Sequence, residues 1–188
     1  MYELINVCRK NNTKIALKLI ENKANLNVQN EDGWTALLYS CFHNKTEIIL
    51  KLIENKANLD HQNYNGRTAL MWSCWNNNSK LVLNLIENKA NLDLQDKNGR
   101  TALMWSCINN NTEIALKLIE NKANLDLQNK YGETALMYSC RYNNKKIILK
   151  FIENKANLDV QDEGGWTALM ESCINNNIEI VSYLLELC

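Results

Sequence analysis

The chain has 188 residues, carries 21 basic and 21 acidic side chains, and is 46% hydrophobic. This length allows one or two globular domains, and the composition excludes a disordered chain and a membrane-spanning one. Zero formal charge argues against nucleic acid or an anionic membrane as a partner, because neither would attract the chain over distance.

The start of the sequence shows no secretion signal. Met1 is followed by polar and charged residues without an apolar core, and the longest apolar runs are only a few residues. Seven cysteines, an odd number, do not suggest a disulfide framework. We therefore expect an intracellular, cytoplasmic protein whose thiols stay reduced.

The glycines reveal an internal repeat of 33 residues, and threonine and cysteine keep the same interval. The recurring residues are Gly33, Gly66, Gly99, Gly132 and Gly165, then Thr35, Thr68, Thr101, Thr134 and Thr167, then Cys8, Cys41, Cys74, Cys107, Cys140 and Cys173. Two neighbouring copies, 65–96 and 98–129, match at 25 of 32 positions. Such similarity is typical of recent duplication.

The repeat at 31–63 shows the elements of one unit. Thr35 is predicted to cap a short helix that begins at Ala36. Asn44 stands where the chain must reverse, because Asn is the non-glycine residue that best adopts the left-handed conformation ending a helix. A second helix is predicted from about Thr46. Its apolar residues lie on one side: Ile48, Ile49, Leu52 and Ile53.

An extended piece and a polar turn follow the second helix, so each unit is predicted to be helix, turn, helix and hairpin-like loop. Glu47 and Lys51 lie four residues apart and are expected to support each other on a solvated outer face of Lys and Glu. Helices of two to three turns do not persist alone, so their order must come from the stacking of neighbouring repeats.

These features resemble the ankyrin-repeat family, whose 33-residue unit carries a Thr-Pro-Leu-His signature after a glycine turn. Five matching tetrapeptides begin at Thr35, Thr68, Thr101, Thr134 and Thr167. The resemblance implies an all-α ankyrin-repeat solenoid forming a single domain, 1–188. It would comprise an N-terminal capping repeat at 1–30, full repeats at 31–63, 64–96, 97–129 and 130–162, and a C-terminal capping repeat at 163–188.

The sequence departs from the family pattern at several positions of the repeat, three of which lie in the first helix and the turn after the second helix. Ala replaces the family's Pro at the start of the first helix. Leu or Met replaces its His, which ties neighbouring hairpins by hydrogen bonds, so that tie is expected to be missing. Lys replaces a left-handed Gly, at roughly 1 kcal/mol per repeat if the conformation is kept. These lysines are Lys23, Lys56, Lys89, Lys122 and Lys155.

The cysteines are not predicted to form a redox or metal site. Equivalent positions of stacked repeats lie roughly 8–10 Å apart, whereas a disulfide needs Cα atoms closer than about 7 Å. No cysteines or histidines have zinc-ligand spacing. The six repeat cysteines are predicted to be buried small hydrophobes, and Cys188 to be exposed. We find no catalytic constellation, and therefore predict a non-enzyme without metal or cofactor.

Positions that vary between near-identical repeats are the candidates for recognition. In ankyrin-repeat proteins the hairpin tips and first helices line the concave groove that grips partners, and aromatic residues and arginines gather at the matching positions here. These residue types dominate binding hot spots. The predicted partner-binding residues are Trp34, Phe42, His43, Arg67, Trp72, Trp75, Arg100, Trp105, Arg141, Tyr142 and Trp166.

One column of first-helix residues leaves two interpretations open. Its members could contact a partner, or they could pack between repeats. They are Tyr39, Trp72, Trp105 and Tyr138.

The predicted function is non-catalytic binding of a protein or peptide in the groove by a monomer, with no nucleic acid or membrane as partner. Aromatic pockets around Trp72 to Trp105 would supply most of the affinity. Arg67, Arg100 and Arg141 would select acidic residues of the partner. Two alternatives stay open: an adaptor that brings substrates to a ubiquitin-ligase or signalling complex, and a consensus-like scaffold without a cognate partner.

Overall fold

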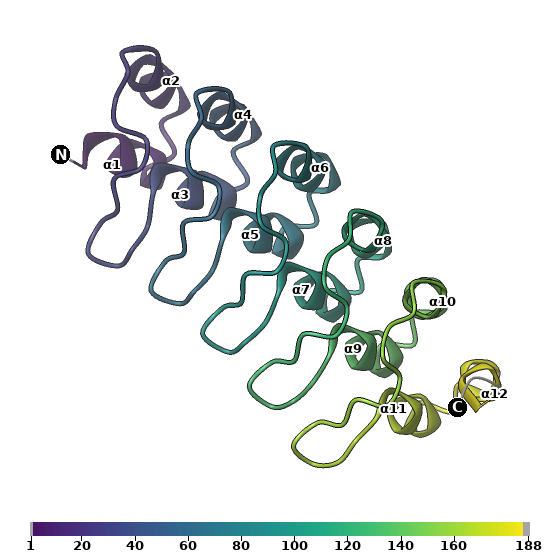
Figure 1. The fold of residues 1–188 in the computed structure, drawn as a ribbon. Helices are drawn as coiled ribbons and strands as arrows, with labels where there is room; N and C mark the ends of the chain where they lie inside the picture. Colours follow the sequence, from purple (N-terminus) through teal and green to yellow (C-terminus); the bar gives the residue numbers. More distant parts are fainter. Residues whose placement is uncertain (1, 186–188) are drawn as a thin grey trace. The chain divides into compact units, whose positions relative to one another are not determined.

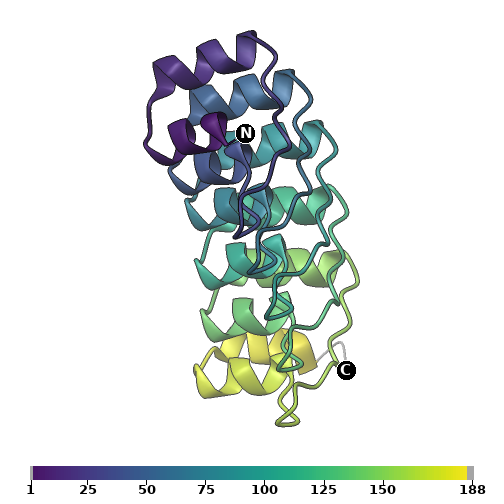
Figure 2. The ribbon, with the colours of Figure 1, turned by 90° about the vertical axis from the view of Figure 1, so that its left-hand side faces the viewer.

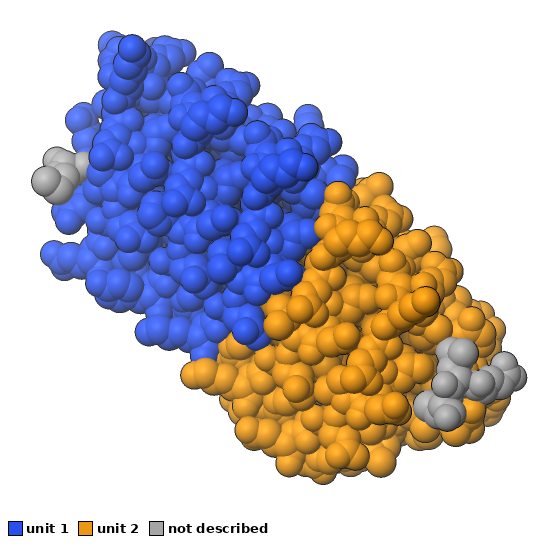
Figure 3. All heavy atoms as spheres, viewed as in Figure 1, with its two compact units in different colours: residues 1–97 blue, residues 98–188 orange. Residues whose placement is uncertain are grey.

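The computed structural model describes residues 2–185, and the chain divides into two compact units, Met1–Lys97 (unit 1) and Asn98–Cys188 (unit 2) (Figure 3). The helices of unit 1 are α1 Glu3–Arg9, α2 Thr13–Glu21, α3 Ala36–Phe42, α4 Thr46–Glu54, α5 Ala69–Trp75 and α6 Ser79–Glu87. Those of unit 2 are α7 Ala102–Ile108, α8 Thr112–Glu120, α9 Ala135–Arg141, α10 Lys145–Glu153, α11 Ala168–Ile174 and α12 Ile178–Leu185. Residues 2–185 contain no strand, as the all-α prediction requires.

Each repeat supplies a seven-residue first helix and a second helix of eight or nine residues (Figure 1). Within each unit the long loops project from the same side of the helix pairs (Figure 2). First helices pack on first helices and second on second: α3 lies between α1 and α5, and α2 contacts α4. In unit 2, α9 lies between α7 and α11, and α8 contacts α10.

The predicted helix boundaries are confirmed. Thr35 is the N-cap of α3, with an extended backbone, and its side-chain oxygen accepts a hydrogen bond from the Leu38 N–H at 3.2 Å. The helix ends before Asn44, whose φ of 54° lies in the left-handed region. The following helix, α4, begins at Thr46. Asn therefore ends one helix within two residues of the start of the next.

The lysines that replace glycine keep the left-handed conformation. The φ of Lys56 is 62° and that of Lys89 is 66°. Their Cβ atoms crowd the backbone there, so the predicted strain is present in each of these repeats.

The loops of neighbouring repeats are tied together even though the family's histidine is missing. In unit 1, the Lys97 N–H donates to the Asn65 carbonyl at 2.9 Å. The Gln62 side-chain amide donates to the carbonyl of Gly66 in its own loop at 2.7 Å and to that of Gln95 in the next at 2.9 Å. Glutamine therefore supplies the side-chain tie that we expected to be absent.

The cysteine column is buried in both units, as predicted, except at its last member. Cys41 and Cys140 have no exposed surface, and burial raises the pKa of each thiol to about 12, so both stay protonated at neutral pH. Cys173 is exposed, so the prediction that it is buried is wrong. No helix of residues 2–185 covers the outer side of α11 as α11 itself covers α9. Cys188 lies outside the described residues.

The same side of the last repeat is unusually apolar. Met170 is 46% exposed, whereas its counterpart Met137, one repeat earlier, is 1% exposed. Ile174 and Ile178 are 65% and 72% exposed. A capping repeat normally presents a polar outer face, and these three exposed apolar side chains depart from that pattern.

No helix among residues 2–185 has the length and apolar character needed to cross a membrane.

Replacing Lys56 by Gly should stabilise the protein by about 0.5–1 kcal/mol, because glycine adopts the left-handed conformation without the Cβ strain. Urea denaturation at pH 7 measures the change. Lys18→Gly, at an exposed position inside α2, is the control and should destabilise by about 1 kcal/mol. A loss of stability in Lys56→Gly would contradict the assigned strain.

A charged residue at Met137 and at Met170, which occupy the same position of two repeats, should have different effects on stability, because only Met137 is buried. Met137→Lys should destabilise the protein by more than about 3 kcal/mol, because it buries an unpaired ammonium group. Met170→Lys should change stability by less than about 0.5 kcal/mol. Thermal and urea denaturation of both variants test this. Equal losses would show that the outer side of α11 is covered in solution.

Candidate recognition surface

The residues predicted to bind a partner fall on the first helices and loops of both units. Unit 1 carries Trp34, Phe42, His43, Arg67, Trp72 and Trp75, and unit 2 carries Arg100, Trp105, Arg141, Tyr142 and Trp166. The repeat places each residue at the loop position after glycine, in a first helix, or directly after that helix. The structure then separates them into packed and accessible side chains.

In unit 1, aromatic rings from the loop and two first helices form one cluster. The Trp34 ring stacks on Tyr39 with centroids 4.6 Å apart and on Trp72 with centroids 5.6 Å apart. Phe42 meets Trp34 and Trp72 edge-on at 5.6 and 5.0 Å. The His43 ring lies edge-on to Phe42 at 4.9 Å. We call Trp34, Tyr39, Phe42 and Trp72 the aromatic cluster.

The cluster combines buried and accessible surface. Trp72 is 6% exposed, whereas Phe42 and Trp75, which lie on α3 and α5, are 45% and 49% exposed. The Arg67 guanidinium lies over the Trp72 ring, 4.6 Å from its centroid, a cation–π contact. Trp72 is therefore the buried member on which the cluster packs, whereas Phe42 and Trp75 have surface that a partner can contact.

In unit 2, Trp105 is packed in the same way. It is 4% exposed, and the Arg100 guanidinium lies 5.2 Å from its ring centroid. Of the two interpretations of the first-helix column, packing is the one that the burial of both tryptophans favours. Tyr142 and Trp166 remain accessible, with 45% and 39% of their surface exposed.

Arg141 is held by two carboxylates of its own unit. Its Nη1 lies 2.8 Å from Glu133 Oε1, its Nε donates to Glu171 Oε1 at 3.1 Å, and its Nη2 also contacts Glu171. Hydrogen bonds to Glu171 and Glu133 raise the pKa of the guanidinium despite its partial burial. The expectation that Arg141 selects acidic residues of a partner does not fit this geometry, because the chain itself supplies the acids.

Glu133 joins Arg141 to a buried tyrosine. Its Oε2 accepts hydrogen bonds from Asn129 Nδ2 at 2.8 Å and from the Tyr138 hydroxyl. Burial alone would raise the pKa of Glu133, but hydrogen bonds from Tyr138, Asn129 and Arg141 and the Arg141 charge lower it overall. Burial and the bond to Glu133 raise the pKa of Tyr138 to about 12. At neutral pH, Glu133 is therefore ionised and Arg141 is protonated, and each is paired with groups of the same unit.

Sequence reasoning missed this network, although a signal was present. Glu133, Arg141 and Glu171 are each exceptions in columns that other repeats fill with aromatic residues, arginine or isoleucine. Two acidic exceptions and one basic exception in adjacent repeats indicate an ion-pair network.

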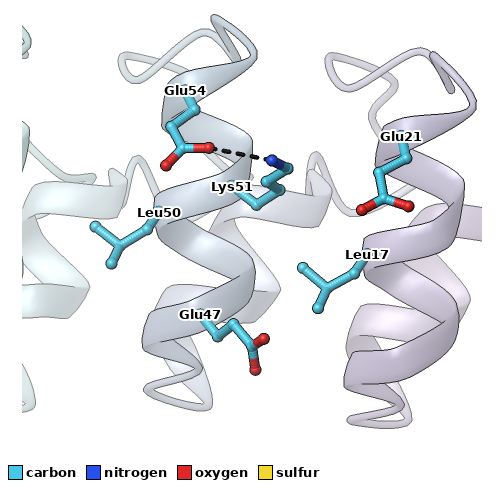
Figure 4. Close-up of a pocket in the computed structure, with 6 residues that line it drawn as sticks. All are labelled: Leu17, Glu21, Glu47, Leu50, Lys51 and Glu54. Atoms are coloured by element: carbon cyan, nitrogen blue, oxygen red, sulfur yellow. Dashed lines mark hydrogen bonds and ion pairs between the residues drawn. The ribbon is translucent and has the colours of Figure 1, made fainter.

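Unit 1 also has a pocket of about 330 Å³ between the second helices α2 and α4 (Figure 4). Its lining residues are Leu17, Glu21, Glu47, Leu50, Lys51 and Glu54. Lys51 Nζ lies 3.3 Å from Glu54 Oε2, so the lysine pairs with this residue and not with Glu47 as its four-residue spacing predicts. Both partners are exposed, which makes the pair weak. The acidic lining matches the solvated outer face predicted for second helices.

Comparison with known proteins decides the family. A family model described as ankyrin repeats in three copies matches residues 4–96, 74–162 and 113–188. The chain belongs to the ankyrin-repeat family. Ankyrin repeats are generally protein–protein interaction modules, so the accessible aromatic residues lie on a scaffold of that class.

The solved structures confirm the predicted solenoid fold. The crystal structure titled "Crystal Structure of EF0377 an Ankyrin Repeat Protein" superposes with a TM-score of 0.88, over 98% of this chain and 96% of that one. The two sequences are 20% identical, so the likeness shows the fold alone: an all-α ankyrin-repeat solenoid. None of the curated proteins matches the sequence.

Within the part of the chain that the structure describes, no three His, Cys, Asp or Glu side chains are grouped so that they could hold a metal ion.

Replacing Arg141 by Met should destabilise the protein by about 1–2 kcal/mol at pH 7, because two carboxylates lose their counter-charge in a partly solvated site. The lowered pKa of Glu133 adds stability above the unfolded-state pKa of about 4.3, and this contribution is lost as the pH falls through the folded-state value. The wild-type advantage should therefore shrink below about pH 4.

Urea denaturation of both proteins at pH 7 and pH 3.5 measures this difference. Arg9→Met, at an exposed arginine of α1, controls for the loss of one surface charge. Equal stability of the Arg141 variant and the wild type at pH 7 would show that the network contributes nothing net.

Proposed function

We propose that the protein is a non-catalytic module that binds a protein or peptide on the first helices and loops of unit 1, with the aromatic cluster at the centre of the contact. The supporting observation is the pair Phe42 and Trp75. Each is about half exposed, and both belong to the first helices, the elements that line the groove of ankyrin-repeat proteins.

The cluster has the properties of a binding hot spot. Phe42 rests on Trp34 and Trp72, so its ring is already ordered before a partner arrives and loses little conformational entropy on binding. Large aromatic side chains bury more apolar surface than others, and they carry much of the affinity at protein interfaces. Arg67 over Trp72 adds a positive charge beside this apolar surface.

The exposed aromatic residues of unit 2 are a second part of the proposed surface. Tyr142 directly follows α9, and Trp166 lies in the loop before α11. Because Arg141 is neutralised by Glu133 and Glu171, we assign unit 2 an apolar and hydrogen-bonding contribution and not the selection of acidic groups.

The double variant Phe42→Ala, Trp75→Ala should weaken partner binding at least about tenfold, because it removes the two accessible rings that form the predicted anchor. Ile15→Ala is the matched control: Ile15 is 45% exposed, similar to Phe42, but lies on the second helix α2. It should change affinity less than about twofold.

Proteins captured by the wild-type chain from a lysate would be identified by mass spectrometry, purified, and titrated against each variant by calorimetry. Circular dichroism confirms that the variants keep their helices. Partners that bind the double variant as tightly as the wild type would overturn the proposed surface.

A further inference from the structure

Among residues 2–97 of unit 1, two buried hydrogen-bond donors have no acceptor. Asn63 is 4% exposed and Trp72 is 6% exposed, and neither Asn63 Nδ2 nor Trp72 Nε1 has a hydrogen-bond partner. The orientation of the Asn63 amide is fixed, because its Oδ1 accepts the backbone N–H groups of Asn65 and Arg67, both at 3.0 Å. The Nδ2 group must therefore point the other way.

Other repeats satisfy the equivalent asparagine. Asn30 Nδ2 donates to the Tyr39 hydroxyl at 3.4 Å in unit 1, and Asn129 Nδ2 donates to the Tyr138 hydroxyl at 2.9 Å in unit 2. A tyrosine hydroxyl accepts as well as donates, whereas an indole N–H only donates. Trp72 stands 33 residues after Tyr39. Asn63 and Trp72 are therefore two donors, at positions where Asn30 and Asn129 each face a tyrosine hydroxyl that accepts their hydrogen bond.

Unit 2 shows which group fits between such donors. There the Glu133 carboxylate accepts from both Asn129 Nδ2 and the Tyr138 hydroxyl, and Arg141 neutralises it. The position of Glu133 in the repeat is occupied by Arg67 in unit 1, and that of Arg141 by Trp75. Unit 1 therefore has the two donors, Asn63 and Trp72, but it has the cation Arg67 at the position where unit 2 has the carboxylate of Glu133.

We propose that unit 1 binds an aspartate or glutamate side chain of the partner, and that this carboxylate takes the place that Glu133 fills in unit 2. Asn63 Nδ2 and Trp72 Nε1 donate to its oxygens, and Arg67 supplies the opposite charge. This rests on the proposed function and names the chemistry of the partner: an acidic residue beside an apolar one that packs on Phe42 and Trp75.

Arg67 is the side chain that has to move. Both donors are covered in the structure, and the partly exposed Arg67 lies over the Trp72 ring. A change of rotamer at a long surface side chain is common when an interface forms. A carboxylate would draw the guanidinium toward itself and reach the donors beneath.

The test follows the Trp72 indole N–H and the Asn63 side-chain amide by NMR in the ¹⁵N-labelled full chain, with the indole signal assigned through Trp72→Phe. N-acetylglutamate with its α-carboxyl group blocked as a methylamide is the probe, and N-acetylglutamine blocked in the same way, which carries no carboxylate, is the control. A charged acceptor should move the Trp72 indole proton downfield in a saturable way, and the neutral amide should not.

The variant Arg67→Glu tests the same site with a carboxylate supplied by the chain itself. It places a carboxylate at the repeat position of Glu133, so the Trp72 indole proton should lie downfield before any probe is added and should no longer respond to the blocked N-acetylglutamate. The matched control Arg100→Glu, in unit 2, should leave the Trp72 response unchanged. A Trp72 signal that ignores the blocked N-acetylglutamate, responds equally to both probes, or is unshifted in Arg67→Glu overturns the proposal.

Partner binding separates this inference from the proposed function. Partners captured from a lysate should bind Arg67→Glu at least about tenfold more weakly. If binding depends on Phe42 and Trp75 but is unchanged in Arg67→Glu, the proposed function stands and the carboxylate site is wrong. If binding is unchanged in the Phe42→Ala, Trp75→Ala variant, the recognition surface itself is wrong.

Discussion

The apolar layer between neighbouring repeats is the contact on which every helix depends. Helices of seven to nine residues gain too little from their own hydrogen bonds to form alone. In unit 1, Leu37 and Leu52 are almost completely buried, in helices that contact those of the adjacent repeats. Each helix pair is therefore stable only when another pair covers its apolar face, so the stability of a repeat depends on its contacts with the adjacent repeats.

This dependence explains why so much of the repeat is constant. The cysteine must be small and apolar to fit the layer, and burial keeps its thiol protonated. The buried serine of the first helix is tolerated because its hydroxyl bonds within its own helix, as Ser40 does to the Ala36 carbonyl at 2.8 Å. Positions that the layer does not constrain lie after the glycine and at the ends of first helices, where recognition residues are free to differ.

The period of 33 and the helix boundaries could be predicted from the sequence because their causes are local. The cap at Thr35 and the left-handed Asn44 each depend on the residue itself and its nearest neighbours in the chain. Exposure of Cys173 could not be predicted from its neighbours in the sequence, which closely match those of the buried cysteines, because the packing of another repeat against this position decides its burial. The role of Trp72 stayed open for a similar reason: an aromatic residue serves packing and binding equally, and only its neighbours in space decide between them.

The ion pairs of Arg141 show how a charged residue at one position of a repeat requires a compensating charge at another. Once Glu133 stands after the glycine, it satisfies Asn129 and Tyr138, but its charge needs Arg141, and Arg141 in turn engages Glu171. Unit 1 has none of these three exceptions and leaves two buried donors without an acceptor. Such donors lower the stability of the free protein. Unit 2 satisfies the equivalent donors with its own Glu133. In the site that we propose for unit 1, a carboxylate of the partner satisfies them, and the stability lost in the free state becomes affinity when it binds.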